Sequence, residues 1–209
     1  MNILIADDHA VVRRGLREIL AEAMPAASFA EAGNGDQVMS LLSKTPTNLL
    51  VLDINMPGRS GLEVLRDVKA QWPKTPVIIL SMQPADQYGV RCMRAGAAAY
   101  VSKESATEEL AKAARKVLAG GKYLSAELTD SLIDSISQTG QKRPHEQLSD
   151  REHEVLRMIA EGKGLTDAAE ALHVSVKTIS TYRTRILTKM GMKSNAELIR
   201  YAIENGLLE

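Results

Sequence analysis

The fold is decided by Asn48–Asp53 (NLLVLD), in which four aliphatic residues run without a break into a carboxylate. A strand without polar alternation is buried on both faces, which is typical of parallel sheets. Pro76–Leu80 has the same character, and shorter apolar runs lie at Ile3–Ala6, Ser28–Ala30 and Ala98–Val101. Together these runs predict a five-stranded parallel sheet.

Amphipathic stretches with helical spacing separate the apolar runs. This alternation predicts an α/β fold, an open doubly wound sheet with the flavodoxin-like strand order. Ser105–Glu108 (SATE) predicts a capping box that opens the fifth helix, and Gly120-Gly121 closes that helix. The predicted helices are Val11–Ala23, Gly35–Ser43, Gly61–Gln71, Ala85–Ala95 and Thr107–Ala119.

The chain changes character after Gly121. Ser125–Ile136 predicts one more helix, whereas Ser137–Gln147 contains no aliphatic or aromatic residue and is interpreted as linker. From Leu148 onward the pattern is entirely helical. We therefore expect a first domain over residues 1–120, a partly helical linker over 121–147 and an all-α domain over 148–209.

The second domain is expected to hold four short helices. Ser149–Glu152 predicts a capping box at the first of them, which Gly162 and Gly164 end. A short helix at Thr166–Leu172, a tight turn at 173–175 and a longer helix at Val176–Met190 are typical of a helix-turn-helix unit.

The overall composition is that of a globular protein. Of 209 residues, 44% are hydrophobic and 25% charged, with a formal net charge of zero, which argues against a disordered chain. Aromatic residues at 3% argue against a base-stacking platform. The single cysteine, Cys92, excludes an internal disulfide and is expected to be an inert buried thiol. No apolar run crosses a bilayer and no signal peptide is evident, so we expect a cytoplasmic protein.

Five polar groups are predicted to meet at one edge of the sheet. Asp7 and Asp8 follow the first strand, Asp53 ends the third, Ser81 ends the fourth and Lys103 follows the fifth. Each alone is more often a solvated turn or surface residue, but ligands bind at the carboxyl ends of such strands. Converging carboxylates repel each other unless a cation binds, and all-oxygen ligands favour Mg²⁺. With a hydroxyl and an ammonium added, the cluster suits a phosphoryl group and an Asp nucleophile.

Motifs around these residues carry a family resemblance over about residues 1–119. IADDH at 5–9, LDINMPG at 52–58, ILS at 79–81 and GAAAYVSK at 96–103 resemble the receiver domains of two-component response regulators. The resemblance implies that Asp53 is the phosphoacceptor, that Lys103 pairs with the phosphate, and that Ser81 and Tyr100 form a switch pair. Glu104 departs from the family, in which Pro is common at that position.

The same resemblance implies a Mg²⁺ site. Asp8 and Asp53 would ligate the ion directly, Asp7 through water and Asn55 through its backbone carbonyl. His9, His145, His153 and His173 show no ligand spacing, so no zinc site is expected.

Positive charge in the second half is concentrated on one helix. Every charged residue between Ala171 and Ala196 is basic, as a helix in a major groove requires; the alternative is a solvated basic face. LSDRE at 148–152, VSVKTI at 174–179 and KMG at 189–191 resemble the LuxR-type DNA-binding domain over about residues 146–208.

By this resemblance Ser180, Thr181 and Thr184 would face bases. Lys177, Arg183 and Lys189 would contact phosphates. Tyr182 stands where His is common, and the last helix would dimerise through Ala196, Ile199 and Ile203.

The two resemblances together indicate a NarL/FixJ-type response regulator. Its expected partners are a sensor histidine kinase, double-stranded DNA and a second copy of the chain. One alternative is a Mg²⁺-dependent phosphohydrolase with Asp53 as nucleophile, but such enzymes use an acid two residues later, where Asn55 stands. Another is a constitutive DNA-binding regulator whose receiver only dimerises.

Overall fold

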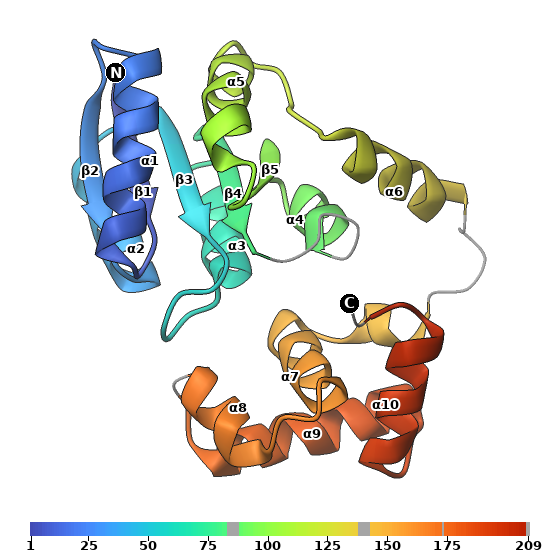
Figure 1. Cartoon of the computed structure of the whole chain (residues 1–209). Coiled ribbons are helices and arrows are strands. Elements are labelled where there is room, and N and C mark those ends of the chain that lie inside the picture. Colours follow the sequence, from blue (N-terminus) through green and yellow to red (C-terminus); the bar gives the residue numbers. More distant parts are fainter. Residues whose placement is uncertain (83–87, 138–142, 173, 208–209) are drawn as a thin grey trace. The chain divides into compact units, whose positions relative to one another are not determined.

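The computed structural model describes residues 1–82, 88–137, 143–172 and 174–207 (Figure 1). The chain divides into two compact units, Met1–Ser137 and Gln138–Glu209, and each is described by itself. Among the described residues, no helix is both long and apolar enough to cross a membrane.

The first unit is built on a five-stranded parallel sheet in the order β2-β1-β3-β4-β5. This confirms the predicted flavodoxin-like order and places the first and third strands side by side. All residues of β3 and β4 are buried, as their unbroken aliphatic sequence predicts. The strands are β1 (Asn2–Ala6), β2 (Ser28–Ala32), β3 (Leu49–Asp53), β4 (Val77–Ser81) and β5 (Ala99–Ser102).

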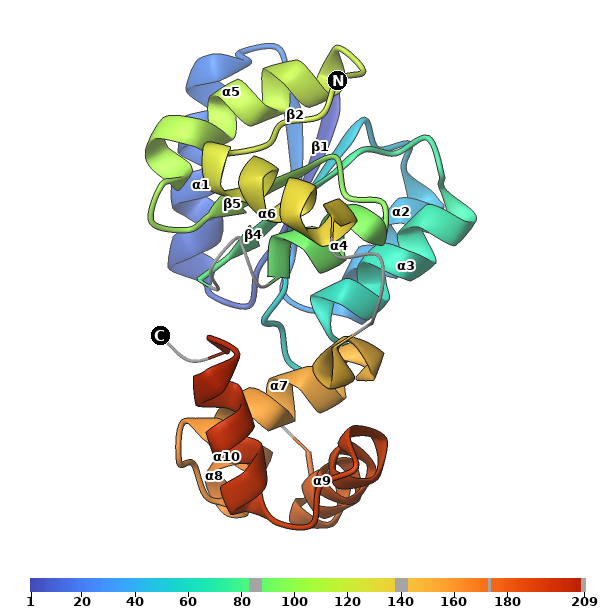
Figure 2. The same ribbon diagram turned by 90° about the vertical axis from the view of Figure 1, so that its right-hand side faces the viewer.

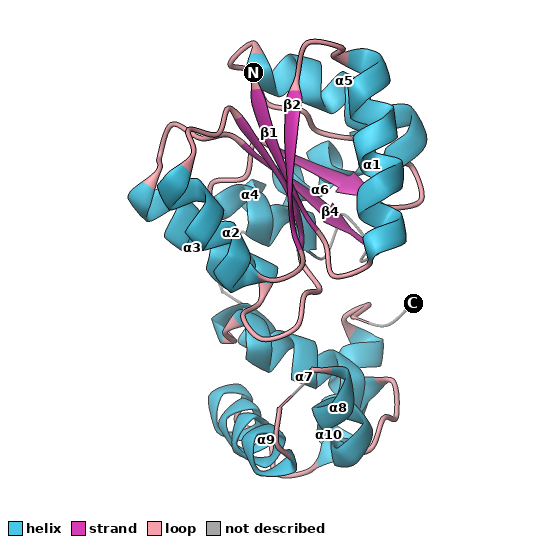
Figure 3. Cartoon of the chain, turned by 90° about the vertical axis from the view of Figure 1, so that its left-hand side faces the viewer, coloured by secondary structure: helices cyan, strands magenta, loops and turns pink. Residues whose placement is uncertain are grey.

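Helices cover both faces of the sheet (Figure 3). On one face α1 (Ala10–Ala23) and α5 (Ala106–Leu118) pack on alternate residues of the strands, including Ile3, Ile5 and Val51. On the other face, the intervening residues of the strands pack on three further helices. These are α2 (Gly35–Lys44), α3 (Gly61–Gln71) and α4 (Val90–Arg94).

The sixth helix, α6 (Ala126–Ser137), packs against α4 within the first unit (Figure 2). Leu128 is fully buried in the core cluster on the α4 face of the sheet. Tyr123, just before α6, forms an isolated parallel bridge with Ala99 of β5. The start of the segment interpreted as linker is thus attached to the sheet.

Two local predictions in the first unit differ from the structure. The helix predicted at Ala85–Ala95 is described only from Tyr88, because residues 83–87 lie outside the described part, and α4 itself begins at Val90. The capping box predicted at Ser105–Glu108 is wrong. The Ser105 hydroxyl makes no cap and instead donates to Ser102 O and Glu109 Oε2, both at 3.3 Å.

The second unit is a small helical domain. Its core contains Val155, Leu156, Ile179, Ile186 and Leu198, all 0–1% exposed. The helices are η2 (Pro144–Gln147), a 3₁₀ turn, followed by α7 (Asp150–Ala160), α8 (Leu165–Ala171), α9 (Val176–Met190) and α10 (Asn195–Glu204).

The observed helix ends of this unit agree with those predicted from the sequence, with one exception. The capping box of Ser149 and Glu152 is present, and the Ser194 hydroxyl accepts from Glu197 N. Gly162, with φ 81°, follows the end of α7 in a conformation that favours glycine. Gly164 does not end α7 as predicted: it is the N-cap of α8, and its N–H donates to Asp167 Oδ2 at 3.1 Å.

The C-terminal part of the predicted linker also has a fixed place. His145 Nδ1 lies 2.8 Å from the Tyr201 hydroxyl of α10. The His145 ring is edge-on to that of His153 in α7, with centroids 6.2 Å apart. Residues 138–142 of the predicted linker lie outside the described residues, but η2 belongs with the helical domain.

Candidate functional site

The candidate site of the first unit lies where β1 and β3 end. The two strands pair in register, with Ala6 opposite Leu52, so Asp7 and Asp53 leave the sheet side by side. Asp7 N donates to Ala32 O at 3.1 Å, which holds the chain in line with β2 for one more residue. The side chains of Asp7 and Asp53 are 0% and 1% exposed. The topology therefore brings two buried carboxyl groups together.

Lys103 joins these carboxyl groups. Its Nζ lies 2.7 Å from Asp7 Oδ2 and 2.7 Å from Asp53 Oδ2. The backbone of Lys103 continues the ladder beyond β5, because its N–H donates to Ser81 O at 2.8 Å. That bond directs the ammonium toward the carboxyl ends of the inner strands, as the sequence predicted.

Burial and ion pairing shift the pKa values of Asp53 and Lys103 in opposite directions. Burial raises the pKa of Asp53 above its ordinary value, although hydrogen bonds from Lys103 and from Asn55 N, at 3.1 Å, act in the opposite direction. For Lys103, burial alone would lower the pKa, but the bonds and negative charges of Asp53 and Asp7 raise it overall. Lys103 therefore stays charged. Its positive charge neutralises one of the two neighbouring carboxylates.

Asp8 and His9 complete an acidic pocket. One ligand atom of each of Asp7, Asp8 and His9 lies within 4.8 Å of the others. Asp8 Oδ1 is buried and accepts no hydrogen bond from the described residues. His9 Nδ1 is 2.9 Å away, but it carries charge only when the ring is protonated. The carboxylate oxygens of this pocket carry more negative charge than Lys103 neutralises, and such a group of oxygen ligands fits a hard divalent cation.

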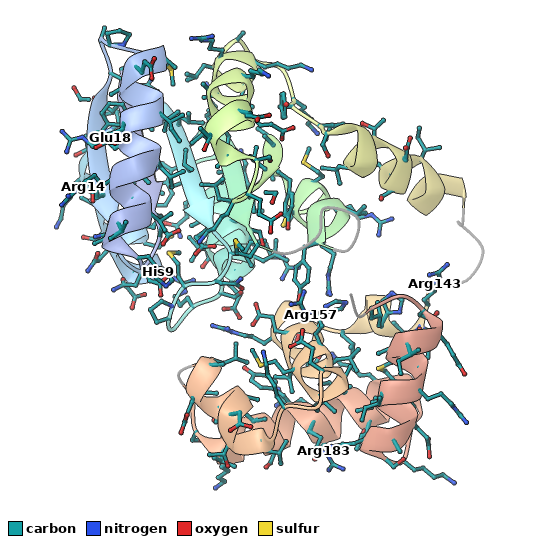
Figure 4. The ribbon with its side chains drawn as sticks, in the orientation of Figure 1. His9, Arg14, Glu18, Arg143, Arg157 and Arg183 are labelled. Atoms are coloured by element: carbon teal, nitrogen blue, oxygen red, sulfur yellow. The ribbon has the colours of Figure 1, made fainter. Side chains whose placement is uncertain are left out.

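Sequence reasoning missed the contacts of two residues at this site. His9, labelled in Figure 4, donates its backbone N–H to Asp7 Oδ1 at 2.8 Å. Arg13, one turn into α1, donates from Nη1 to the backbone carbonyl of Asp7 at 2.7 Å and pairs with Glu31 at 3.0 Å. The only signal was their place in the turn after β1 and in the first part of α1.

The predicted switch pair lies on the neighbouring strands. Ser81 ends β4 and is 0% exposed, and Tyr100 lies within β5 and is 1% exposed. Tyr100 packs in the same core cluster as Leu128 of α6 and Val90 of α4.

The second candidate site is the exposed face of α9. The helix buries Ile179, Ile186 and Met190 in the domain core. Lys177, Thr181 and Thr184 lie on the other side and are exposed, whereas Ser180 is half-buried. Of the predicted DNA-contacting residues, Lys177, Thr181 and Thr184 therefore lie on the solvent side of α9.

Two of the predicted phosphate contacts have partners within the domain. Arg183, labelled in Figure 4, donates from Nε to Asn195 Oδ1 of α10 at 2.6 Å. Lys189 Nζ lies 2.6 Å from Glu152 Oε2, and the Glu152 side chain is 3% exposed. The structure therefore uses these two cations to connect α9 with its neighbours, whereas Lys177 extends into solvent.

Comparison with known proteins finds a matching family for each of the two units. The response regulator receiver domain matches residues 3–115, and the LuxR family of bacterial regulatory proteins matches residues 146–202. The oxygen regulatory protein NreC of Staphylococcus epidermidis is 39% identical over the whole of both chains, and that of Staphylococcus aureus is 38% identical. A structure of RcsB from Salmonella enterica serovar Typhimurium, bound to promoter rprA with the phosphomimetic BeF3⁻, is 28% identical, with a TM-score of 0.62 over 96% of this chain and 98% of that one.

A receiver sheet with its acidic pocket and a LuxR-type helical domain define a two-component response regulator of the NarL/FixJ type. The chain belongs to this family, whose members are DNA-binding transcription regulators and not enzymes. The predicted family is thereby confirmed.

Proposed function

We propose that Asp53 accepts a phosphoryl group and that this modification controls DNA binding by the second unit. The observation that carries the proposal is the 2.7 Å contact of Lys103 Nζ with Asp53 Oδ2 at the end of β3. An Asp53 carboxylate oxygen would attack phosphorus and form an acyl phosphate, while the donor's bond to phosphorus breaks and its electron pair leaves with the donor. The donor is a phosphohistidine of a sensor kinase or a small acyl phosphate.

Asp7, Asp8, Asp53 and the carbonyl of Asn55 would hold Mg²⁺. The ion would neutralise charge on the transferred oxygens. The chain's own contribution is Lys103, whose ammonium lies next to the attacking oxygen and would pair with the phosphoryl group once it is in place. The new negative charge then competes with Asp7 for Lys103.

The phosphoryl group would be sensed through Ser81 and Tyr100. The Ser81 hydroxyl would turn toward a phosphoryl oxygen, and the Tyr100 ring would follow into the space that it leaves. Tyr100 shares its core cluster with Leu128, so the change would reach α6. We expect the output to be a homodimer in which Ala196, Ile199 and Ile203 of α10 form a seam, with paired recognition helices on double-stranded DNA.

The relatives support this output. The RcsB structure named above is bound to a promoter, and α9 of this chain presents an exposed polar face. Phosphotransfer from a kinase and binding to chromosomal DNA both take place in the cytoplasm, where we place the protein. The domains we propose are the receiver at 1–120, the connecting segment at 121–147 and the DNA-binding domain at 148–209.

The phosphoacceptor is tested by intact mass after incubation with acetyl phosphate and Mg²⁺. We expect one phosphoryl adduct on the wild type, none on Asp53→Asn, and none when EDTA replaces Mg²⁺. Asp36→Asn, which changes an exposed acid of α2, is the matched control and should retain the adduct. Full adduct formation on Asp53→Asn would refute the site.

DNA binding is tested on duplex DNA with and without phosphorylation. The logarithm of the affinity should fall by about 0.9 for each phosphate neutralised as the logarithm of salt concentration rises. Equal affinity of both forms for every duplex would instead favour a constitutive regulator.

A further inference from the structure

Three threonines form a line along the exposed face of α9. Thr181, Thr184 and Thr188 are exposed and follow one another at intervals of three and four residues, so they share one side of the helix. The opposite side is buried in the domain core. In a helix-turn-helix unit the second helix lies in the major groove with its N-terminal residues at the base edges, which places Thr181 and Thr184 nearer the bases than Thr188.

Each of these hydroxyls already donates its hydrogen. Thr181 Oγ1 donates to Lys177 O at 3.0 Å, Thr184 Oγ1 to Ser180 O at 3.0 Å, and Thr188 Oγ1 to Thr184 O at 2.9 Å. A hydroxyl has one hydrogen to donate and two lone pairs that accept. With the hydrogen bonded to the helix, each threonine offers DNA only an acceptor oxygen and a methyl group.

An acceptor and a methyl group select among base pairs. In the major groove adenine and cytosine present an amino donor, guanine presents two acceptors, and thymine presents a methyl group. A hydroxyl that only accepts gains nothing from a guanine edge, and a G·C pair offers it the cytosine amino group but no methyl group for the threonine methyl. Adenine and thymine together satisfy both groups, because the oxygen can accept from adenine N6 and the methyl can pack on the thymine methyl.

Two of the four basic side chains of α9 are held by neighbours within the domain, whereas Lys177 and Arg185 are exposed. Arg183 donates to Asn195 and Lys189 pairs with Glu152, so neither is free to reach a base edge without breaking a contact. Val176, at the start of α9, is 44% exposed and adds another apolar group at the N-terminal end of the helix.

We propose that Thr181 and Thr184 of α9 each read an A·T base pair, with each methyl on a thymine methyl and each hydroxyl oxygen accepting from adenine N6. The inference rests on the proposed function, because it needs α9 in the major groove. The inference goes beyond the proposed function by assigning a base preference and the two residues that determine this preference.

The experiment uses the full-length protein, treated with acetyl phosphate, and a selection from randomised duplex DNA. In the selected site, each thymine is then replaced singly by deoxyuridine, which lacks only the methyl group. Affinities are compared for wild type, for Thr181→Ser and Thr184→Ser, which lose a methyl, and for Thr181→Val and Thr184→Val, which lose the oxygen. Thr129→Ser and Thr129→Val are matched controls, because Thr129 of α6 is exposed and makes the same bond, to Ser125 O at 2.9 Å.

We expect deoxyuridine to weaken wild-type binding about fourfold at one or two positions, the value of one buried methyl. The Ser variant of the matching threonine should lose this sensitivity, and the Val variant should keep it. The Val variant should also bind the selected site about threefold to tenfold more weakly than wild type, as the loss of one hydrogen bond predicts. Both Thr129 variants should behave as wild type.

The inference is overturned if the protein binds its selected site with no sensitivity to deoxyuridine. It is also overturned if the positions affected by Thr181 and Thr184 are G·C pairs. The proposed function itself fails in a different way, because a protein that binds no duplex even when phosphorylated refutes both. The two failures are therefore distinguished by whether any duplex is bound.

Discussion

Gly89 and Leu128 touch across the contact between α4 and α6: a methyl group on Gly89 would lie 2.6 Å from Leu128 Cδ1. Gly89 stands directly before α4 and adopts an ordinary helical conformation, with φ −58° and ψ −45°. Its lack of a side chain is therefore needed for space, since the Leu128 side chain occupies that place. Through Leu128, α6 is fixed to the receiver by a close fit that tolerates little added volume.

A double-mutant cycle tests this fit. Leu128→Ala should destabilise the first unit by about 2–5 kcal/mol, as expected for removing a buried leucine. Gly89→Ala should also destabilise the wild type, but it should be nearly neutral in Leu128→Ala, where the methyl has room. Urea unfolding followed by fluorescence of Trp72, the single tryptophan, which packs in this unit, measures each corner. Additive effects would show that the two residues are not coupled.

Removal of the Lys103 ammonium should expose the repulsion between Asp7 and Asp53. Lys103→Met leaves two buried carboxyl groups unpaired, and we expect a loss of about 3–5 kcal/mol in the free energy of unfolding at neutral pH. Adding Asp53→Asn should restore part of that loss, because one negative charge is gone. The measurement is again the urea midpoint, with Lys112→Met, an exposed lysine of α5, as the control. The prediction fails if both lysine variants lose equally little.

The stability of the second unit should fall at acidic pH, and protonation of Glu152 should cause part of that fall. Burial would raise the pKa of Glu152, but the bonds from Lys189 and from Ser149 lower it overall from its ordinary value of 4.5. Since the folded pKa lies below the unfolded one, the stabilisation is complete above about pH 4.5 and is lost as the pH falls through the folded pKa.

The matching variant is Glu152→Gln. It should cost about 1–2 kcal/mol at neutral pH, as for a hydrogen bond to a charged group with one exposed partner. The difference from wild type should shrink as the solution is acidified from pH 6 to pH 3. Helix content by circular dichroism during urea unfolding measures it, and a difference that stays constant with pH would contradict the assignment.

Tyr201 should anchor the 3₁₀ turn η2 to the helical domain. Tyr201→Phe removes the hydroxyl that lies 2.8 Å from His145 Nδ1, at an expected cost of about 1 kcal/mol. Amide hydrogen exchange in residues 143–148 should become faster, and that of the first unit should be unchanged. Unaltered exchange in this segment would mean that the hydroxyl does not hold the turn.

The sheet and the acidic pocket were predictable because their signals are local. The residues of Val77–Ser81 alone predict a buried strand. The rule for open α/β sheets then places the carboxyl ends of the strands at one edge. The meeting of Asp53 and Lys103, 50 residues apart, followed from that rule and was found at 2.7 Å. The assignment of Asp53 as phosphoacceptor stays a prediction.

The remaining features depend on contacts that no local pattern encodes. His145 was interpreted as linker, yet its partner Tyr201 lies 56 residues away. The contact of Lys189 with Glu152, 37 residues earlier, had no signal in the sequence, and the phosphate contact of Lys189 stays a prediction. Ser105 has the right sequence for a capping box, but its hydroxyl is bonded to Ser102 O instead. In each case tertiary geometry decided among several partners that the sequence allowed.

The attachment of α6 to the receiver and of η2 to the helical domain shortens the covalent tether between the units. Only residues 138–143 separate Ser137 from Pro144, so the two attachment points can never be more than about 25 Å apart. A tether this short keeps each unit at an effective concentration in the millimolar range as seen by the other.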